Sequence, residues 1–432
     1  MNLAREAIQK GQSLKKGWCP SAHRPMQSGD GLLLRVRPRV GSLTLDQLIV
    51  IAELAEHHGS GHIDLTNRAN LQLRGLTPET YSDAIAALIT SGIVEADANA
   101  EAARNIVVDP RSGLDPDRID VRSLASELEK ILIERRELHA LPNKFGFSLS
   151  GSSTDVSAHP TADIAITAHE TETFELALDG DASLRAVVQT SAVTAAALSL
   201  AAVFQELSAV NSDLHRMRDA VSRYGASTIY QKAALTSKAT TAKQKNAPAK
   251  SYVGLLTRAQ APYAVAIGLP FGRITATTLK DLAKQAIALG CKQSRFSQTR
   301  TLIIPIENQT AAEHLLNAAA NLNLITRADD PRLMMHVCPG APSCANATTS
   351  TRIDAERLAA TLTWPNDDMP SIHISGCEKG CAHRAGTQIT FVARNGAYDL
   401  IVNGSTQSAP NIAAIPPNAL STALLSLTDP RP

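Results

Sequence analysis

The chain carries almost no net charge. Its 42 lysines and arginines nearly balance its 41 aspartates and glutamates, which leaves a formal charge of +1 at pH 7. This balance excludes a protein that binds nucleic acid regardless of sequence, because such a protein needs a basic face or tail. The segment 1–17 lacks an apolar core and does not predict a secretory signal. The most apolar stretch, 186–204, is interrupted by polar residues and predicts a packed helix, not a membrane span.

Cysteines are few, but four of the six stand in two close pairs. The pairs are Cys338 with Cys344, and Cys377 with Cys381. Soft sulfur ligands select zinc, copper(I) or an iron–sulfur cluster. Zinc sites favour two to four residues between paired cysteines, so the five residues of the first pair fit zinc poorly. We therefore expect a [4Fe–4S] cluster, with zinc and cysteines without a metal as the alternatives.

The remaining two cysteines, Cys19 and Cys291, are isolated in the sequence, and we expect both to serve packing. Paired cysteines without an export signal favour the reducing cytoplasm, where thiolates stay available for a metal. We expect a cytoplasmic protein without a membrane partner.

The sequence contains an internal repeat. The first copy has a strand near 31–37, a helix over 45–58 and a strand at 62–66, and the second has the same order from 263 to 304. Alternating apolar residues mark the strands, and helical spacing marks the segments between them. Units this small cannot bury enough surface alone, so we expect the two copies to pair.

A larger segment follows each copy, and a polar, basic connector separates the two halves. The sequence predicts five regions: a half-domain at 18–80, an α/β domain at 98–235, a linker at 236–252, a second half-domain at 253–320, and a cysteine-bearing α/β domain at 329–432.

These features together resemble the sulfite/nitrite reductase superfamily. The resemblance rests on the repeat, on the two cysteine pairs and on the stretch Thr66-x-Arg68-x-x-x-Gln72. Within that superfamily, Asp329-Asp-Pro-Arg-Leu333 and Cys381-Ala-His383 resemble the precorrin-3B synthase family. The resemblance implies an α+β fold with pseudo-two-fold symmetry, in which two ferredoxin-like half-domains pair and carry two larger α/β domains.

For function, the resemblance implies a [4Fe–4S] cluster on the four paired cysteines and a tetrapyrrole substrate, precorrin-3A. The family reaction uses O2 and a reductant to hydroxylate the C20 carbon while an acetate closes a γ-lactone. It also implies a second, mononuclear non-haem iron. No nucleotide-binding glycine fingerprint is found, so we expect electrons from an external donor, an NADH-linked reductase or a ferredoxin.

A tetrapyrrole with many carboxylates needs fixed cations, and arginine binds a carboxylate through two hydrogen bonds. The candidates for substrate binding are Arg35, Arg37, Arg68, Gln72, Arg74, Arg104 and Arg300, with Arg295 as a further arginine of the second repeat. The candidates for a catalytic role are Arg68, Arg104 and Lys144, which fall on anion-site positions of the superfamily, and His383 beside a cluster cysteine, with His336 next to consider.

Two departures bear on the choice within the superfamily. Sulfite reductases have a second lysine where this chain has Gly146. The absence of this cation argues against the hypothesis of an enzyme that reduces a small oxyanion. The segment 295–300 keeps Arg300 but lacks the tryptophan usual in the synthases. The alternatives are a sirohaem-dependent sulfite or nitrite reductase and a non-catalytic iron–sulfur electron carrier.

Overall fold

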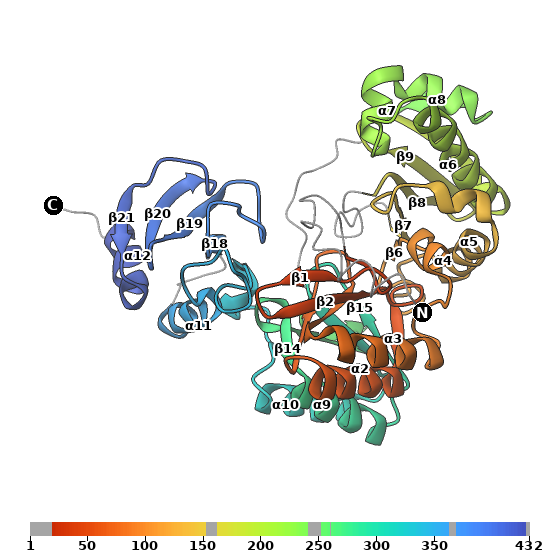
Figure 1. Cartoon of the computed structure of the whole chain (residues 1–432). Helices are drawn as coiled ribbons and strands as arrows, with labels where there is room; N and C mark the ends of the chain where they lie inside the picture. Colours follow the sequence, from red (N-terminus) through yellow and green to blue (C-terminus); the bar gives the residue numbers. More distant parts are fainter. Residues whose placement is uncertain (1–19, 153–161, 241–251, 260, 363–368, 429–432) are drawn as a thin grey trace.

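The structure is a computed structural model that describes residues 20–152, 162–240, 252–259, 261–362 and 369–428. Helices and strands alternate in an α+β fold built of four sheets. Two sheets form a central unit from the repeats, and the other two lie on different sides of it (Figure 1). Cys19 and the linker residues 241–251 lie outside the described residues.

Each half-domain has an antiparallel sheet that takes its last strand from the other repeat. The first sheet consists of β1 (Met26–Ser28), β2 (Gly31–Val36), β5 (Leu71–Leu76), β4 (His62–Leu65) and, from the second repeat, β14 (Arg273–Thr275). The second consists of β12 (Gly254–Arg258), β13 (Ala261–Gly268), β16 (Thr301–Pro305), β15 (Gln293–Phe296) and, from the first repeat, β3 (Ser42–Thr44). This reciprocal exchange joins the half-domains into one unit.

Helices cover the central unit, namely α2 (Leu45–His58), α3 (Pro78–Thr90), α9 (Ala276–Ala288) and α10 (Gln309–Asn321). The side chains of Thr44 and Thr275 cap α2 and α9 at equivalent positions of the two repeats. Helix α2 ends before Gly59, where a Cβ would lie 2.5 Å from the Arg74 carbonyl oxygen. One hydrophobic core contains residues of both repeats, so the expected pairing of the half-domains is confirmed.

The two larger domains have the same strand order. The first contains β6 (Ile106–Val108), β7 (Phe147–Ser150), β8 (Ile164–Glu170), β9 (Thr173–Leu178), β10 (Leu184–Gln189) and β11 (Ser237–Ala239). The second contains β17 (Met335–Val337), β18 (Ile372–Ser375), β19 (Thr387–Arg394), β20 (Ala397–Gly404) and β21 (Ile412–Ile415). In both, the first three strands are parallel and the next are antiparallel, so these domains form a second repeat.

The helices of the first large domain are α4 (Ala98–Ala103), α5 (Arg122–Glu134), α6 (Val193–Val210), α7 (Met217–Tyr224) and α8 (Ala226–Lys232). Those of the second are α11 (Thr351–Thr361) and α12 (Leu420–Thr428). Short 3-10 turns complete the chain: η1 (Arg136–Ala140), η3 (Thr190–Ala192), η4 (Pro270–Gly272), η5 (Pro331–Met334) and η6 (Pro417–Ala419).

Two sequence expectations need correction. The helix expected over 186–204 begins only at Val193, because the preceding residues form β10, in which Val187 and Val188 pair with β9. The segment expected as a linker from 236 begins with β11, the edge strand of the first large sheet. Within the described residues, one helical segment, Thr190–Val210, is long and apolar enough to cross a membrane, but eight side chains of α6 belong to the buried core of the domain.

Some contacts between the large domains and the half-domains are crossed between the repeats. Arg295 of the second repeat donates to the carbonyl oxygens of Pro110 (3.1 Å) and Ser112 (2.6 Å) in the first large domain. Arg74 of the first repeat donates to the carbonyl oxygen of Ser343 (2.9 Å) in the second large domain. The crossing places the cysteine loop against the first half-domain.

The shared core predicts which apolar side chains hold the central unit. Ile51 on α2 is fully buried, so Ile51→Ala should lower the apparent free energy of unfolding by about 2–5 kcal/mol. Urea unfolding followed by circular dichroism measures this loss. The matched control is Ile353→Ala on α11, where the side chain is 54% exposed and a change within about 0.5 kcal/mol is expected. Equal losses in the two variants would contradict the assignment of the core.

Candidate functional site

The paired cysteines follow two neighbouring parallel strands. Cys338 comes directly after β17, and Cys377 comes two residues after the end of β18. Because these strands pair in parallel, their C-terminal ends meet at the same edge of the sheet. Cys344 and Cys381 stand further along the same two loops. The topology therefore brings both pairs together.

Glycines let these loops pack closely. The backbone N–H of Gly376 donates to the Cys338 sulfur at 3.1 Å, and a Cβ at Gly376 would lie 2.6 Å from the Ala347 Cβ. Gly340 has a φ of +68°, and a Cβ there would lie 2.3 Å from the Thr351 hydroxyl. Side chains at these two positions would push the cysteine loops apart.

The four thiols fit a cluster better than a single ion. Cys338 is buried and Cys381 is exposed as a residue, yet desolvation of the Cys381 thiol is the main cause that raises its pKa, followed by the other three thiols. The other three thiols thus shift the pKa of the Cys381 thiol in the direction expected of neighbouring thiolates. Among the described residues, however, no group of three or more His, Cys, Asp or Glu is arranged to hold one metal ion, and no cysteine is in a disulfide. A cubane gives each sulfur its own iron, so it does not require three thiols around one ion.

Three histidines gather beside the cysteines. His336 on β17 is the register partner of His373 on β18, and the rings of His336 and His383 stack with centroids 4.3 Å apart. His373 is fully buried, and neither ring nitrogen has a hydrogen-bond partner. Burial, followed by neighbouring His383, lowers the pKa of His336 to about 3 and that of His373 to about 4. These two imidazoles are therefore neutral at neutral pH.

The sequence reasoning considered His383 and His336 but missed His373. The signal was available, because His373 stands between two buried isoleucines of a strand, Ile372 and Ile374, and so faces the side opposite to them.

The structure places Arg104, predicted for substrate binding and catalysis, in buried contacts with protein groups. Its side chain is fully buried, with Nε 2.7 Å from Glu101 Oε2 and Nη1 3.3 Å from Glu129 Oε1. A third bond from Nη2 reaches the Ile93 carbonyl oxygen at 2.9 Å. The guanidinium stabilises the first large domain, because its charge compensates two buried carboxylates.

Two further predicted arginines also make structural contacts. Arg37 is buried and donates to the carbonyl oxygens of Glu101 and Ala102, at 2.8 and 3.2 Å, and burial lowers its pKa to about 10. Arg74 is 3% exposed and binds both carboxylate oxygens of Asp30 at 2.9 Å. Both side chains therefore join domains.

The other predicted residues keep some exposure. Arg35 and Gln72 are half-buried partners on neighbouring strands, and Arg35 and Arg68 lie close enough to Arg37 to lower its pKa. Arg68 stands in the turn between β4 and β5. Lys144 is exposed on the loop before β7.

Arg300 joins the cysteine and histidine group. It occupies the turn between β15 and β16, and its Cδ would be 2.5 Å from a Cβ at Gly272, so only glycine leaves room for it. Arg300 is close enough to His336 and His383 to lower the pKa of each. Of the predicted cations, this is the one that the electrostatic contacts place beside the histidines.

Gly146 occupies a site without room for a lysine. Its N–H donates to Asp163 Oδ2 at 3.0 Å, and a Cβ would lie 2.5 Å from Asn105 Nδ2 and 2.8 Å from the Asn105 carbonyl oxygen. The packing of the first large domain therefore excludes a lysine side chain at position 146.

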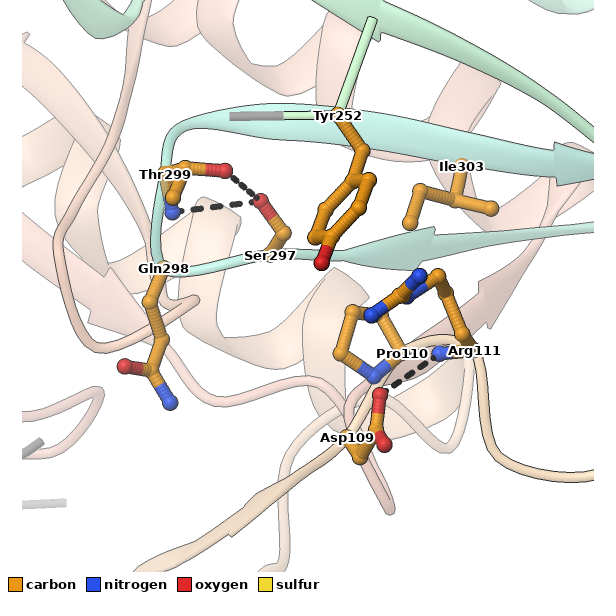
Figure 2. Close-up of a pocket in the computed structure, with 8 residues that line it drawn as sticks. All are labelled: Asp109, Pro110, Arg111, Tyr252, Ser297, Gln298, Thr299 and Ile303. Carbon is orange, nitrogen blue, oxygen red and sulfur yellow. Dashed lines mark hydrogen bonds between the residues drawn. The ribbon is translucent and has the colours of Figure 1, made fainter. Parts of the chain in front are cut away.

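A small pocket lies between the first large domain and the second half-domain, beside the loop that corresponds to the first cysteine loop. Asp109 and Pro110 follow β6 as Cys338 and Pro339 follow β17. Figure 2 shows this pocket, lined by Asp109, Pro110, Arg111, Tyr252, Ser297, Gln298, Thr299 and Ile303. The Arg111 guanidinium stacks over the Tyr252 ring at 3.7 Å. An aspartate therefore stands where the second domain has a cluster cysteine.

Two family profiles match the chain. The nitrite/sulfite reductase ferredoxin-like half domain matches residues 24–90, and the nitrite and sulphite reductase 4Fe-4S domain matches residues 99–240. The second segment contains no cysteine, so the cysteines that can hold a cluster are those of the other copy, from 338 to 381.

Curated relatives and a solved structure agree with these profiles. A precorrin-3B synthase of Sinorhizobium sp is 32% identical, over 96% of this chain and 88% of that protein. A chloroplastic ferredoxin–nitrite reductase of Spinacia oleracea is 22% identical, over 87% of this chain and 68% of that protein. The structure of Mycobacterium tuberculosis NirA has a TM-score of 0.72 at 19% identity, covers 91% of this chain and 79% of that one, and shows the shared fold.

The paired half-domains and the four cysteines define an iron–sulfur oxidoreductase of the sulfite/nitrite reductase class. Within this superfamily, the chain belongs to the precorrin-3B synthase family.

The buried contacts of Arg104 predict a structural defect when it is replaced. Arg104→Met leaves Glu101 and Glu129 buried without their partner and should cost about 3–5 kcal/mol of the stability of the first large domain. Urea unfolding measures the loss, and the exposed Arg384→Met is the control, with a change below about 1 kcal/mol. Normal stability of Arg104→Met together with lost substrate binding would restore the predicted catalytic role.

The cluster assignment predicts that the cysteines are not interchangeable. Cys381→Ser should lose most of its iron and sulfide and the paramagnetic signal of the reduced cluster, because one ligand is removed. Cys291→Ser is the control, since Cys291 belongs to the core of the half-domains. Full retention of cluster iron in Cys381→Ser would refute this ligand.

Proposed function

We propose that the protein is a precorrin-3B synthase, which hydroxylates precorrin-3A at C20 while the ring A acetate closes a γ-lactone. One atom of O2 enters the macrocycle and the other leaves as water, so the reaction also needs two electrons and two protons. The similarity to the Sinorhizobium precorrin-3B synthase along 96% of the chain supports this proposal.

The observation that carries the choice within the superfamily is Gly146. Reduction of a small oxyanion needs dense positive charge at the reacting centre. At this position of the chain, Asn105 fills the space that a lysine would need. A large substrate with its own carboxylates needs cations that are spread over its edge instead, and the half-buried Arg35, Arg68 and Arg300 provide such a set.

The residues have different parts in this proposal. Cys338, Cys344, Cys377 and Cys381 would hold the [4Fe–4S] cluster, which supplies electrons one at a time. Arg35, Arg68, Gln72 and Arg300 would bind and orient the substrate carboxylates. His383, which stacks on His336, would donate a hydrogen bond to the substrate or to a cluster sulfide.

Activation of O2 requires a metal centre separate from the iron–sulfur cluster, and the family resemblance implies a mononuclear non-haem iron. The arrangement of the described side chains does not fit that group, because no three His, Cys, Asp or Glu residues among them are placed to hold a metal ion. We assign no ligands to it. We propose an external electron donor, a ferredoxin or an NADH-linked reductase, and a cytoplasmic location.

The test is an oxygen-dependent turnover. Protein purified without oxygen is incubated with precorrin-3A and a chemical reductant, and ¹⁸O2 is then admitted. The expected product is a hydroxylactone that contains one labelled oxygen atom by mass spectrometry, formed only after O2 is added. Failure to form this product with cluster-loaded protein would overturn the proposal.

The same preparation separates the alternatives. A sirohaem-dependent reductase would retain a tetrapyrrole with strong visible absorption and would consume sulfite or nitrite. An electron carrier would oxidise and reduce its cluster without changing precorrin-3A.

A further inference from the structure

Asp64 is the centre of a buried charge network between the two half-domains and the cysteine domain. It lies on β4 and is 6% exposed. Its Oδ1 accepts hydrogen bonds from Arg273 Nε at 2.6 Å and Arg352 Nη2 at 3.2 Å. Its Oδ2 accepts from Arg273 Nη2 at 3.0 Å and lies 3.6 Å from Arg74 Nη1. One carboxylate therefore faces three guanidinium groups.

One of these arginines connects Asp64 to the first cluster cysteine. Arg352 is the second residue of α11, next to Thr351. The Thr351 hydroxyl donates to the Cys338 carbonyl oxygen at 2.8 Å and lies 3.8 Å from the Cys338 sulfur. A shift of Arg352 would thus move the start of α11 and, with it, Cys338.

Arg74 connects the same carboxylate to the second cysteine. Its Nη2 donates to the carbonyl oxygen of Ser343, the residue before Cys344, at 2.9 Å. Asp30 and the Ser28 hydroxyl hold the same guanidinium, and the Ser28 hydroxyl also donates to Ser343 O at 3.0 Å. Both cysteines of the first pair are therefore linked to Asp64 through one arginine each.

The network remains charged at neutral pH. Burial alone would raise the pKa of Asp64, but Arg352 and Arg273 hold it well below its usual range. Burial lowers the pKa of Arg352 only to about 10, with Asp64 opposing that change. The carboxylate is thus an anion at the base of the cysteine loop, where burial makes each charge act over a longer distance than in water.

We propose that Asp64 is a positioning residue for the iron–sulfur cluster: it seats the Cys338–Cys344 loop on the first half-domain, and its negative charge lowers the reduction potential of the cluster. A negative charge disfavours the added electron, and groups beyond the direct ligands tune a cluster in this way. The inference rests on the cluster of the proposed function, but not on the identity of the substrate.

The test compares two variants with opposite charge changes. Asp64→Asn keeps the shape of the side chain and removes the negative charge, so the midpoint potential should shift to more positive values. Arg352→Gln removes a positive charge from the same network, so the midpoint should shift to more negative values. Both are measured by a redox titration followed by the paramagnetic signal of the reduced cluster, with iron and sulfide content determined on the same samples.

The second repeat offers a matched control. Asp64 on β4 pairs with Arg273 of the exchanged strand β14, and Arg295 on β15 pairs with Ser42 of the exchanged strand β3. Arg295 therefore holds the position in the second repeat that Asp64 holds in the first. Arg295 contacts the large domain without cysteines, through Pro110 and Ser112. Arg295→Gln can lower stability, but it should leave the cluster potential unchanged.

Each outcome decides the proposal. Shifts of the midpoint potential in opposite directions in Asp64→Asn and Arg352→Gln support the proposal. Wild-type potentials in both variants overturn it. A shift in Arg295→Gln as large as that in Asp64→Asn also overturns it. If Asp64→Asn loses its iron while Arg295→Gln keeps it, the seating role is supported, and the sign of the Arg352→Gln shift decides the electrostatic role. The redox titration needs no substrate. Its result therefore does not depend on the outcome of the turnover test.

Discussion

The strand exchange between the half-domains places β14 beside β4, and this pairing brings Arg273 opposite Asp64. Arg352 of the cysteine domain also contacts this ion pair, because it donates a hydrogen bond to Asp64. The position of the cysteine loops therefore depends on the exchange, because neither half-domain alone contains both charges. The hydrophobic core supplies most of the stability of the central unit, while these buried charges set the orientation of what is attached to it.

The two large domains show how one fold carries different chemistry. Both order their strands alike, and Gly151-Ser152 follows β7 as Gly376-Cys377 follows β18. In the first domain, Asp109 stands at the position of Cys338 and forms an ion pair with Arg118 at 2.5 Å. A charge pair within the protein thus replaces a cysteine of the cluster site. Because the five shared strands keep the same order while the loops after them differ, substitutions in the loops make the pseudo-symmetric molecule chemically asymmetric.

The sequence predicted the features that depend on local pattern. Helix α2 has the predicted bounds, and the pairing of the half-domains and the cysteine grouping follow from the repeat and the spacing. The buried contacts of Arg104 and Arg74 were not predicted, for a physical reason. A family position shows that an arginine is present, but not whether its guanidinium meets a substrate or a buried carboxylate. Glu129 is 25 residues from Arg104, and Asp30 is 44 residues from Arg74, so no local pattern reveals these two pairs. Glu101, the other partner of Arg104, is only three residues away.

The charge that remains at the site is consistent with a large, anionic substrate. Arg37, Arg74 and Arg104 are held in structural contacts, and His336 and His373 are neutral because burial opposes their protonation. Arg300 is then the cation that acts on the histidines beside the cysteines, and burial also lowers its pKa. Under the proposed function, Arg35, Arg68 and Arg300 would each bind a separate carboxylate of the macrocycle, so a large substrate would not need a dense cluster of cations.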